Sequence, residues 1–260
     1  MFEVSLNLAL MLIVAAFAAG FVDSIAGGGG LITLPALLLA GASPLQALST
    51  NKVQGTFGVA TAAISYARAG HVGLRRQIGA ATLAFAAGVA GAGLASIAPT
   101  QWLRLALPAI LIAIAGFFAL KPGLSDLDRA ERLRPASLTA FVVPLIGGYD
   151  GLIGPGAGSF YMIAFVMLAG YGVLKATAHT KLLNFASNLG GLLAFALQGT
   201  PWWGIGLCMG LAQIAGARLG ARLGARLGAR LAMLVGARLI KPVLVVTSVA
   251  LALRLIWQML

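Results

Sequence analysis

The chain has 260 residues, of which 60% are hydrophobic and 9% are charged, and its mean hydropathy is +0.98. This composition lies far outside that of soluble globular domains and excludes a soluble enzyme or binding domain. The net charge of +12 would suggest nucleic acid as a partner in a soluble protein. Here the basic residues lie mainly between apolar segments, so we expect a membrane protein with no nucleic-acid partner.

Apolar segments follow one another along the whole chain, and we expect an all-α, polytopic bundle of about eight to ten transmembrane segments. Segments 77–98 and 102–120 have the length of a full crossing, about 20 residues. Segments 31–41 and 137–149 reach only about 17 to 20 Å as helices, so they are predicted to be half-helices. The full set is 4–22, 30–41, 48–68, 77–98, 102–120, 137–149, 157–170, 176–198, 202–224 and 239–259.

Lys and Arg concentrate in every second connection, after the third, fifth, seventh and ninth segments. The positive-inside rule places these connections in the cytoplasm and the N-terminus in the periplasm or outside the cell. The first segment is preceded by Glu3 and no basic residue, so we interpret it as a retained helix and not as a signal peptide. The expected location is the inner membrane of a bacterium.

A similar motif occurs once in each half of the chain. FVDSIAGGGG at 21–30 contains Asp23, and GYDGLIGPGAG at 148–158 contains Asp150 at the matching position. A second pair follows in the same order, ALSTNK at 47–52 and ATAHTK at 176–181. Because each half holds an odd number of segments, we predict two inverted transmembrane repeats, 1–120 and 137–260, joined by a polar cytoplasmic linker at 121–136.

Each glycine cluster is predicted to interrupt a helix, since glycine costs about 1 kcal/mol relative to alanine at an interior position. A new helix is expected to begin at Leu31 and at Ser159, where unpaired backbone N–H groups and the helix dipole favour an anion. The alternative is that these glycines serve only close helix packing. The predicted anion site takes from the two clusters Gly27, Gly28, Gly29, Gly30, Gly154, Gly156, Gly158 and Ser159.

Lys52 and Lys181 are predicted to lie in the first turn of their helices, where the helix dipole disfavours a cation. A bound anion would remove this conflict, and Thr50, Asn51 and Thr180 would add polar groups beside it. The alternative is that both lysines extend to the membrane interface, which is common near helix ends.

Asp23 and Asp150 lie outside the N-terminus and the central linker, where the other acidic residues occur. Intramembrane carboxylates relay protons or pair with cations, but either residue could instead cap a helix. His179 could titrate near neutral pH or be a hydrogen-bonded structural group. Asn184 lies one helical turn from Asn188, and this polar stripe contacts either the substrate or a neighbouring helix.

A Gly-Ala-Arg-Leu repeat runs from residue 216 to residue 230. As a helix it would carry a cationic stripe, and we expect it to form a cytoplasmic helix end against anionic lipids. Close packing through its glycines and a duplication without a specific role are alternatives. No P-loop, paired metal motif or nucleophile motif is found, so we expect no cofactor, no metal and no enzymatic site. The single cysteine, Cys208, is expected to serve packing.

Together, the paired Asp and glycine-rich motifs with Lys52 and Lys181 downstream resemble the sulfite exporter TauE/SafE family of membrane transporters, over nearly the whole chain. The resemblance implies a secondary transporter of sulfite, a sulfonate or a related small organic anion. Our leading hypothesis is a small-anion carrier that works by alternating access. The alternatives are a membrane enzyme or subunit that handles a sulfur compound with a partner, and a structural membrane protein. The anion, the coupling ion, the direction and the oligomeric state are left open.

Overall fold

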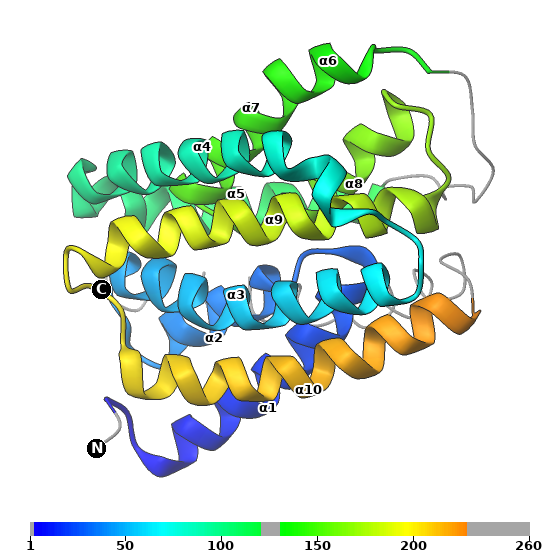
Figure 1. The fold of residues 1–260 in the computed structure, drawn as a ribbon. Helices are drawn as coiled ribbons and strands as arrows, with labels where there is room; N and C mark the ends of the chain where they lie inside the picture. The colour runs from blue at the N-terminus through cyan, green and yellow to red at the C-terminus, as the bar shows by residue number, and fades with distance from the viewer. Residues whose placement is uncertain (1–2, 121–130, 228–260) are drawn as a thin grey trace.

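The structure is a computed structural model that describes residues 3–120 and 131–227. Every regular element in these residues is a helix, which confirms the predicted all-α fold (Figure 1). The tenth predicted segment, 239–259, and most of the linker lie outside the described residues. In chain order the helices are α1 Leu6–Ala26, α2 Gly30–Leu39, α3 Pro44–Arg68, η1 Leu74–Gln77, α4 Ile78–Ile97, α5 Thr100–Leu120, α6 Pro135–Ser137, η2 Leu138–Val142, α7 Val143–Leu152, α8 Ala157–Met167, α9 Val173–Ala196 and α10 Trp203–Leu227.

Three helical stretches in the described residues are long and apolar enough to cross a membrane by length and composition: Leu6–Ala26, Leu74–Ile97 and Trp203–Gly224. The half-helices are α2 and α8, which reach about 15 and 17 Å at the helical rise. Residues 135–152 are helical throughout, about 27 Å, so the half-helix predicted at 137–149 is longer than expected. The apolar run ends before Asp150, but the backbone stays helical to Leu152.

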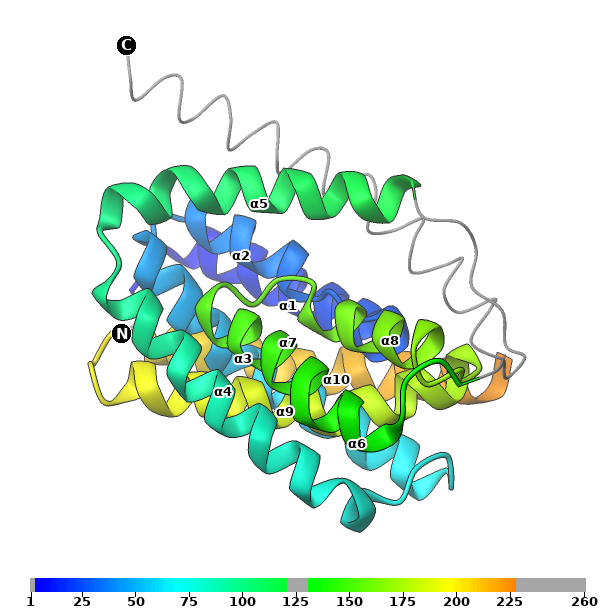
Figure 2. The ribbon, with the colours of Figure 1, turned by 90° about the horizontal axis from the view of Figure 1, so that it is seen from above.

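The helices of the two chain halves interlock. Helix α1 packs against α10, and α7 packs against α4, so each contact joins an early helix to a late one. Helices α3 and α9 lie next to each other in the middle of the bundle, between these pairs (Figures 1 and 2). Helix α5 lies along the outside of the bundle, beside α2 (Figure 2).

Glycines set the closest of these helix contacts. A Cβ added to Gly216 on α10 would overlap the carbonyl oxygen of Phe17 on α1. A Cβ added to Gly91 on α4 would overlap the carbonyl oxygen of Gly148 on α7. In the Gly-Ala-Arg-Leu repeat, the glycines of the described part are buried, whereas Arg218 and Arg222 are exposed. The repeat therefore has a packing face and a cationic face.

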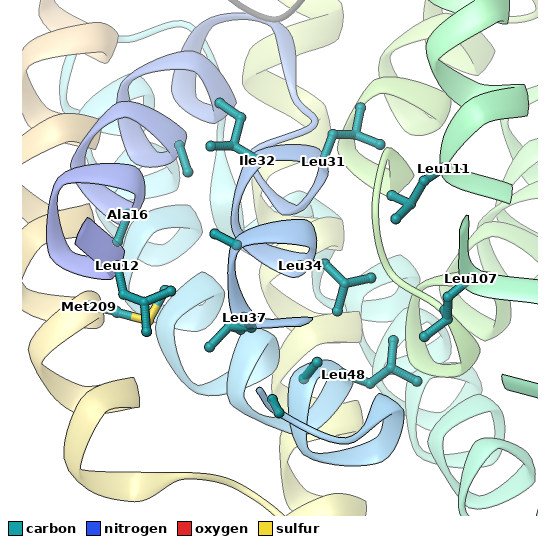
Figure 3. Close-up of a cluster of buried hydrophobic side chains, with 14 of the residues drawn as sticks. Leu12, Ala16, Leu31, Ile32, Leu34, Leu37, Leu48, Leu107, Leu111 and Met209 are labelled. Carbon is teal, nitrogen blue, oxygen red and sulfur yellow. The ribbon is translucent and has the colours of Figure 1, made fainter. Parts of the chain in front are cut away.

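The half-helix α2 runs through the main hydrophobic cluster (Figure 3). Leu34 and Leu37 on α2 are fully buried. Leu12 of α1 and Met209 of α10 lie together on one side of α2 in Figure 3, and leucines of α5 lie on the other. This packing holds the start of α2 in place, although the chain before it is not helical.

The connections after α3, after α8 and before α6, together with the end of α10, lie at one end of the bundle, on the right of Figure 1. The basic residues at this end include Arg75 in η1, Arg132 before α6 and Lys175 in the first turn of α9. The connections after α2, α4 and α9 lie at the opposite end and carry no Lys or Arg. Arg104, near the start of α5, is an exception. The charge separation expected from the sequence is thus present in the described part of the chain.

Candidate functional site

The chain is interrupted between α1 and α2 and again between α7 and α8. The backbone φ angle is +76° at Gly27 and +93° at Gly28 in the first break, and +93° at Gly154 and +85° at Gly156 in the second. Residues with a side chain rarely adopt these angles, whereas glycine does so without strain. Both predicted glycine-rich helix breaks are therefore confirmed.

The helices after the breaks begin slightly earlier than predicted, α2 at Gly30 and α8 at Ala157. The first backbone N–H groups of a helix have no partner within the helix. Within the described residues, no acceptor pairs with the N–H groups of Gly30, Gly158 or Ser159. Each half-helix thus presents free donors and the positive end of its dipole at a break.

The two breaks touch each other. Ser159 Oγ at the start of α8 donates a hydrogen bond to the carbonyl oxygen of Ala26 at the end of α1, over 2.9 Å. A Cβ added to Gly27 would lie 2.5 Å from the backbone N of Ser159. Beside the start of α2, a Cβ added to Gly30 would lie 3.3 Å from Pro155 Cα. The two helix starts therefore share one region of the bundle.

A cavity of about 30 Å³ lies at this junction, enough for one or two water molecules. Residues of both halves line it, and most of the predicted glycines and amides are among them. The lining consists of Asp23, Gly28, Gly29, Gly30, Asn51, Gln54, Gly55, Val59, Asp150, Gly154, Gly156, Ala157, Gly158, Asn184, Asn188 and Gln213.

Two ion pairs cross between the halves beside the cavity. Lys52 Nζ on α3 lies 2.6 Å from Asp150 Oδ1 on α7. Lys181 Nζ on α9 lies 3.5 Å from Asp23 Oδ2 on α1, and it also donates a hydrogen bond to the backbone oxygen of Asp23. Both lysines are buried, at 1% exposure. Their burial does not support the alternative in which both lysines extend to the membrane interface.

The two aspartates have different surroundings. Both carboxylate oxygens of Asp150 are hydrogen-bonded, Oδ1 to Lys52 and Oδ2 to Ser187 Oγ and Asn188 Nδ2. Asp23 Oδ1 accepts a hydrogen bond from the backbone N–H of Gly29, over 3.1 Å, and so caps the start of α2. Asp23 Oδ2 is buried and receives no hydrogen bond from any described residue.

The predicted position of the lysines in the first turn of their helices is wrong. Helix α3 begins at Pro44 and α9 at Val173, so Lys52 and Lys181 are each the ninth residue of their helix. The Ser43 side chain forms a capping box with Gln46, which starts α3 before the apolar run begins. The charge of each lysine is offset by an aspartate of the opposite half.

Besides the two lysines, five predicted residues lie off the cavity lining: Gly27, Thr50, Ser159, His179 and Thr180. Thr50 Oγ1 accepts a hydrogen bond from the backbone N–H of Trp202, over 2.9 Å, and Thr180 Oγ1 donates to the carbonyl of Ala176 in its own helix. His179 Nδ1 bonds to the Lys175 carbonyl, and its ring packs against aromatic rings. The geometry of His179 matches the structural alternative.

Sequence reasoning missed a chain of neutral polar groups beside the cavity. Gln54 Nε2 donates to Thr33 Oγ1 over 2.8 Å and to Asn51 Oδ1 over 2.7 Å, and Gln213 Nε2 donates to Gln54 Oε1. These side chains come from α2, α3 and α10. Polar residues inside apolar helices usually face a protein interior or a cavity, so Gln54 and Gln213 were detectable by that signal.

Comparisons with known proteins agree with this architecture. The sequence profile of the sulfite exporter TauE/SafE family matches residues 12–255. The chain belongs to the TauE/SafE family. It is 54% identical to a "probable membrane transporter protein" of Sinorhizobium over 98% of this chain and 94% of the relative. Proteins of the same name from Escherichia coli strain K12 and Haemophilus influenzae are 42% and 36% identical, over 99% and 98% of this chain and 93% and 97% of their own lengths. No solved structure matches the chain.

Family membership confirms the resemblance found in the motifs and identifies the chain as a membrane transporter. These TauE/SafE relatives are named transporters, none of them an enzyme. Cys208 is half-buried on α10, and neither Cys208 nor His179 lines the cavity. In the part of the chain that the structure describes, no group of three or more His, Cys, Asp or Glu side chains is placed to hold a metal ion.

Proposed function

We propose that the chain is a secondary transporter that moves a small anion, such as sulfite, a sulfonate or a related sulfur-containing or small organic anion, across the inner membrane of a bacterium. One observation carries this proposal. The starts of α2 and α8 meet at a buried cavity, and the backbone N–H groups of Gly30, Gly158 and Ser159 have no acceptor among the described residues. Free N–H groups at helix starts are suited to bind an anion.

The cavity offers more than backbone donors. Asn51 and Asn184 line it from α3 and α9, and their amide groups can donate to an oxyanion. Lys52 and Lys181 lie behind the lining, each paired with an aspartate of the cavity wall. Backbone and side-chain donors from both halves would therefore share one anion.

The way in which the two halves meet supports the proposal of alternating access. The cavity lies between the halves, and the ion pairs Lys52–Asp150 and Lys181–Asp23 each join one half to the other. The packing of α1 on α10 and of α7 on α4 supports the proposed inverted repeat. In such folds one repeat moves against the other around a central site.

The proposed orientation places the basic end of the bundle in the cytoplasm and the N-terminus outside. Arg218 and Arg222 are exposed on the last turns of α10, where attraction to anionic lipid headgroups would contribute about 1 kcal/mol per arginine. An accessible cysteine introduced at Asn7, before the first buried turn of α1, would react with an impermeant thiol reagent added to intact cells if this orientation holds. Labelling only after cell lysis would reverse it.

The transport proposal is tested first by binding. Purified protein is heated with sulfite, thiosulfate, sulfoacetate, sulfate, acetate or chloride. A ligand at a hundredfold excess over its dissociation constant stabilises the folded state by about 2.7 kcal/mol. The anion that stabilises is then measured for flux into proteoliposomes. We expect selective stabilisation and flux for one sulfur anion.

The matched variants are Asn184→Ala in the cavity lining and Asn7→Ala on the exposed face of α1. Both remove one amide. We expect only the change at Asn184 to weaken the anion effect. Equal effects of the two variants, or no response to any anion in stability and flux, would contradict the proposed function.

A further inference from the structure

Asp23 and Asp150 occupy matching positions in the two motifs but are not equally satisfied. Asp150 is held by Lys52, Ser187 and Asn188, with hydrogen bonds to both oxygens. Asp23 Oδ2 has only the more distant Lys181 ammonium, at 3.5 Å, and no hydrogen bond from a described residue. One of the two carboxylates therefore has partners at both oxygens, and the other has a buried oxygen without a hydrogen-bond donor among the described residues.

The sequence explains this asymmetry. Ser187 and Asn188 follow Lys181 by six and seven residues on α9. The residues that follow Lys52 by the same intervals on α3 are Gly58 and Val59, which have no side-chain donor. Val59 lines the cavity together with Asp23, so α3 presents an apolar side chain at the position where α9 presents the amide of Asn188.

The helices packed around Asp23 bring few other charges to it. Helix α9 contributes Lys181, and α7 contributes Asp150 across the cavity. The lysine of α3, Lys52, is engaged by Asp150. Helix α10 contributes the neutral Gln213, while its arginines 218 and 222 are exposed. Tyr66 of α3 donates to the Ser24 carbonyl, and the described parts of α2 and α8 contain no acidic or basic residue.

A buried carboxylate oxygen without a hydrogen bond is costly as an ion, and a proton on that oxygen removes the cost. Protonation of Asp23 also removes the negative charge that offsets Lys181. The ammonium of Lys181 is then an uncompensated buried cation beside the cavity. An anion in the cavity would neutralise it, so the binding of the proton and the binding of the anion favour each other.

We propose that Asp23 is the proton-coupling residue of the transporter, which takes one proton from solvent onto Oδ2 for each anion bound, and that Lys181 is the counter-charge of that anion. The pair Lys52–Asp150 stays closed and joins the halves throughout. This inference rests on the proposed anion transport. It refines that proposal, because protonation of Asp23 leaves only Lys181, and not Lys52, without its counter-charge and available to the anion.

The first test needs no ligand. Infrared spectra of the purified protein in lipid nanodiscs are recorded as the pH is lowered, to follow the band of a protonated carboxyl group. Glu3 and the other carboxyl groups also protonate in acid, so the spectra of the wild type and the variants are compared at each pH. We expect the wild-type band to contain a component that is absent from Asp23→Asn and present in Asp150→Asn. If the spectra of Asp23→Asn and the wild type show the same carboxyl bands at every pH, the inference is overturned.

A second variant keeps the test decisive if Asp23→Asn does not fold. Val59→Asn places on α3 the amide that Asn188 provides on α9. The new amide would donate to Asp23 Oδ2 and favour its ionised form, so the carboxyl band should appear only at lower pH than in the wild type. An unchanged or higher midpoint in a folded Val59→Asn protein would overturn the inference.

The third measurement tests whether proton binding and anion binding are coupled, through the pH dependence of the anion affinity. Sulfoacetate is the probe, because both of its acidic groups stay ionised near neutral pH, unlike sulfite. One linked proton makes the affinity fall about tenfold per pH unit once Asp23 is ionised, and Asp23→Asn should remove this slope. Anion binding in the wild type that does not depend on pH would overturn the coupling but leave the transporter standing. No binding or flux of any anion in the panel would overturn both.

Discussion

Lys52 on α3 and Asp150 on α7 form a buried ion pair, with Nζ 2.6 Å from Oδ1, although 98 residues separate them in the chain. The ammonium comes from the first half of the sequence and the carboxylate from the second. Removing one charge would leave its partner buried without compensation, which is costly in a protein interior.

We therefore expect Lys52→Met to destabilise the fold by about 3 to 5 kcal/mol. The double variant Lys52→Met with Asp150→Leu should recover part of this loss, because no unpaired charge then remains. Titration of SDS into mixed micelles measures the free energy of unfolding. If the two single changes simply add in the double variant, the residues do not interact in the folded protein.

Two glycines of α4, only two positions apart, make a matched test of the helix packing. A Cβ at Gly91 would overlap the carbonyl oxygen of Gly148, whereas a Cβ at Gly93 would meet nothing within 4 Å. We expect Gly91→Ala to destabilise the fold by about 1 to 3 kcal/mol through overpacking. Gly93→Ala should be neutral or stabilising by about 0.4 to 1 kcal/mol, because alanine restricts the unfolded chain. The same unfolding titration decides this, and equal losses would contradict the close approach of α4 and α7.

The fold was largely predictable because apolar length is a strong signal. The boundaries of α4 at Ile78–Ile97 lie within one residue of the predicted segment 77–98. Hydropathy did not predict the start of a helix correctly where the helix carries polar residues of the site. Helix α3 begins four residues before the predicted segment, since Ser43 and Pro44 form a start signal that hydropathy does not register.

The site was predictable only in part. The glycine motifs located both breaks, because such backbone angles need glycine. The partners of Lys52 and Lys181 could not be deduced, since nothing local in the sequence says that α3 meets α7 or that α9 meets α1. The interaction of Gln54 with Gln213 also depends on tertiary packing, as the two residues are 159 positions apart in the chain.

Glu3 ties the N-terminal segment to the start of α10, where its carboxylate accepts hydrogen bonds from the backbone N–H groups of Gly204 and Ile205, over 2.9 and 3.1 Å. Partial burial raises the pKa of Glu3, but these hydrogen bonds outweigh it and hold the pKa below its ordinary value. A lowered folded-state pKa gives stability that is present above the unfolded pKa and is lost as the pH falls through the folded pKa.

We expect Glu3→Gln to be less stable than the wild type at neutral pH and equal to it in acid. Melting temperatures of both proteins in one detergent, measured from neutral to acidic pH, give the difference directly. Because Glu3 is exposed, the difference should be small and should shrink with added salt. A difference that persists at acidic pH would show that the carboxylate charge is not its source.

Alanine variants of Gly27 and Gly199 distinguish the role of Gly27 in the proposed anion site from the general effect of a positive φ angle. Both have a positive φ angle, +76° and +67°, so alanine costs about 1 to 3 kcal/mol of backbone strain at either position. At Gly199 a new Cβ meets nothing within 4 Å, whereas at Gly27 it would lie 2.5 Å from the backbone N of Ser159. Only Gly27→Ala should therefore push the two helix starts apart and cover a free N–H group of the proposed anion site.

Without ligand we expect Gly27→Ala to lose more stability than Gly199→Ala, because its new Cβ overlaps the start of α8 in addition to straining the backbone. The anion that stabilises the wild type should bind Gly27→Ala about tenfold more weakly, a loss of about 1.4 kcal/mol. Gly199→Ala should bind that anion as the wild type does. The measurement is the shift in melting temperature as a function of anion concentration for the three proteins. If Gly27→Ala keeps the wild-type affinity, the helix starts at Gly30 and Ser159 do not hold the anion, and the N–H groups there serve the fold alone.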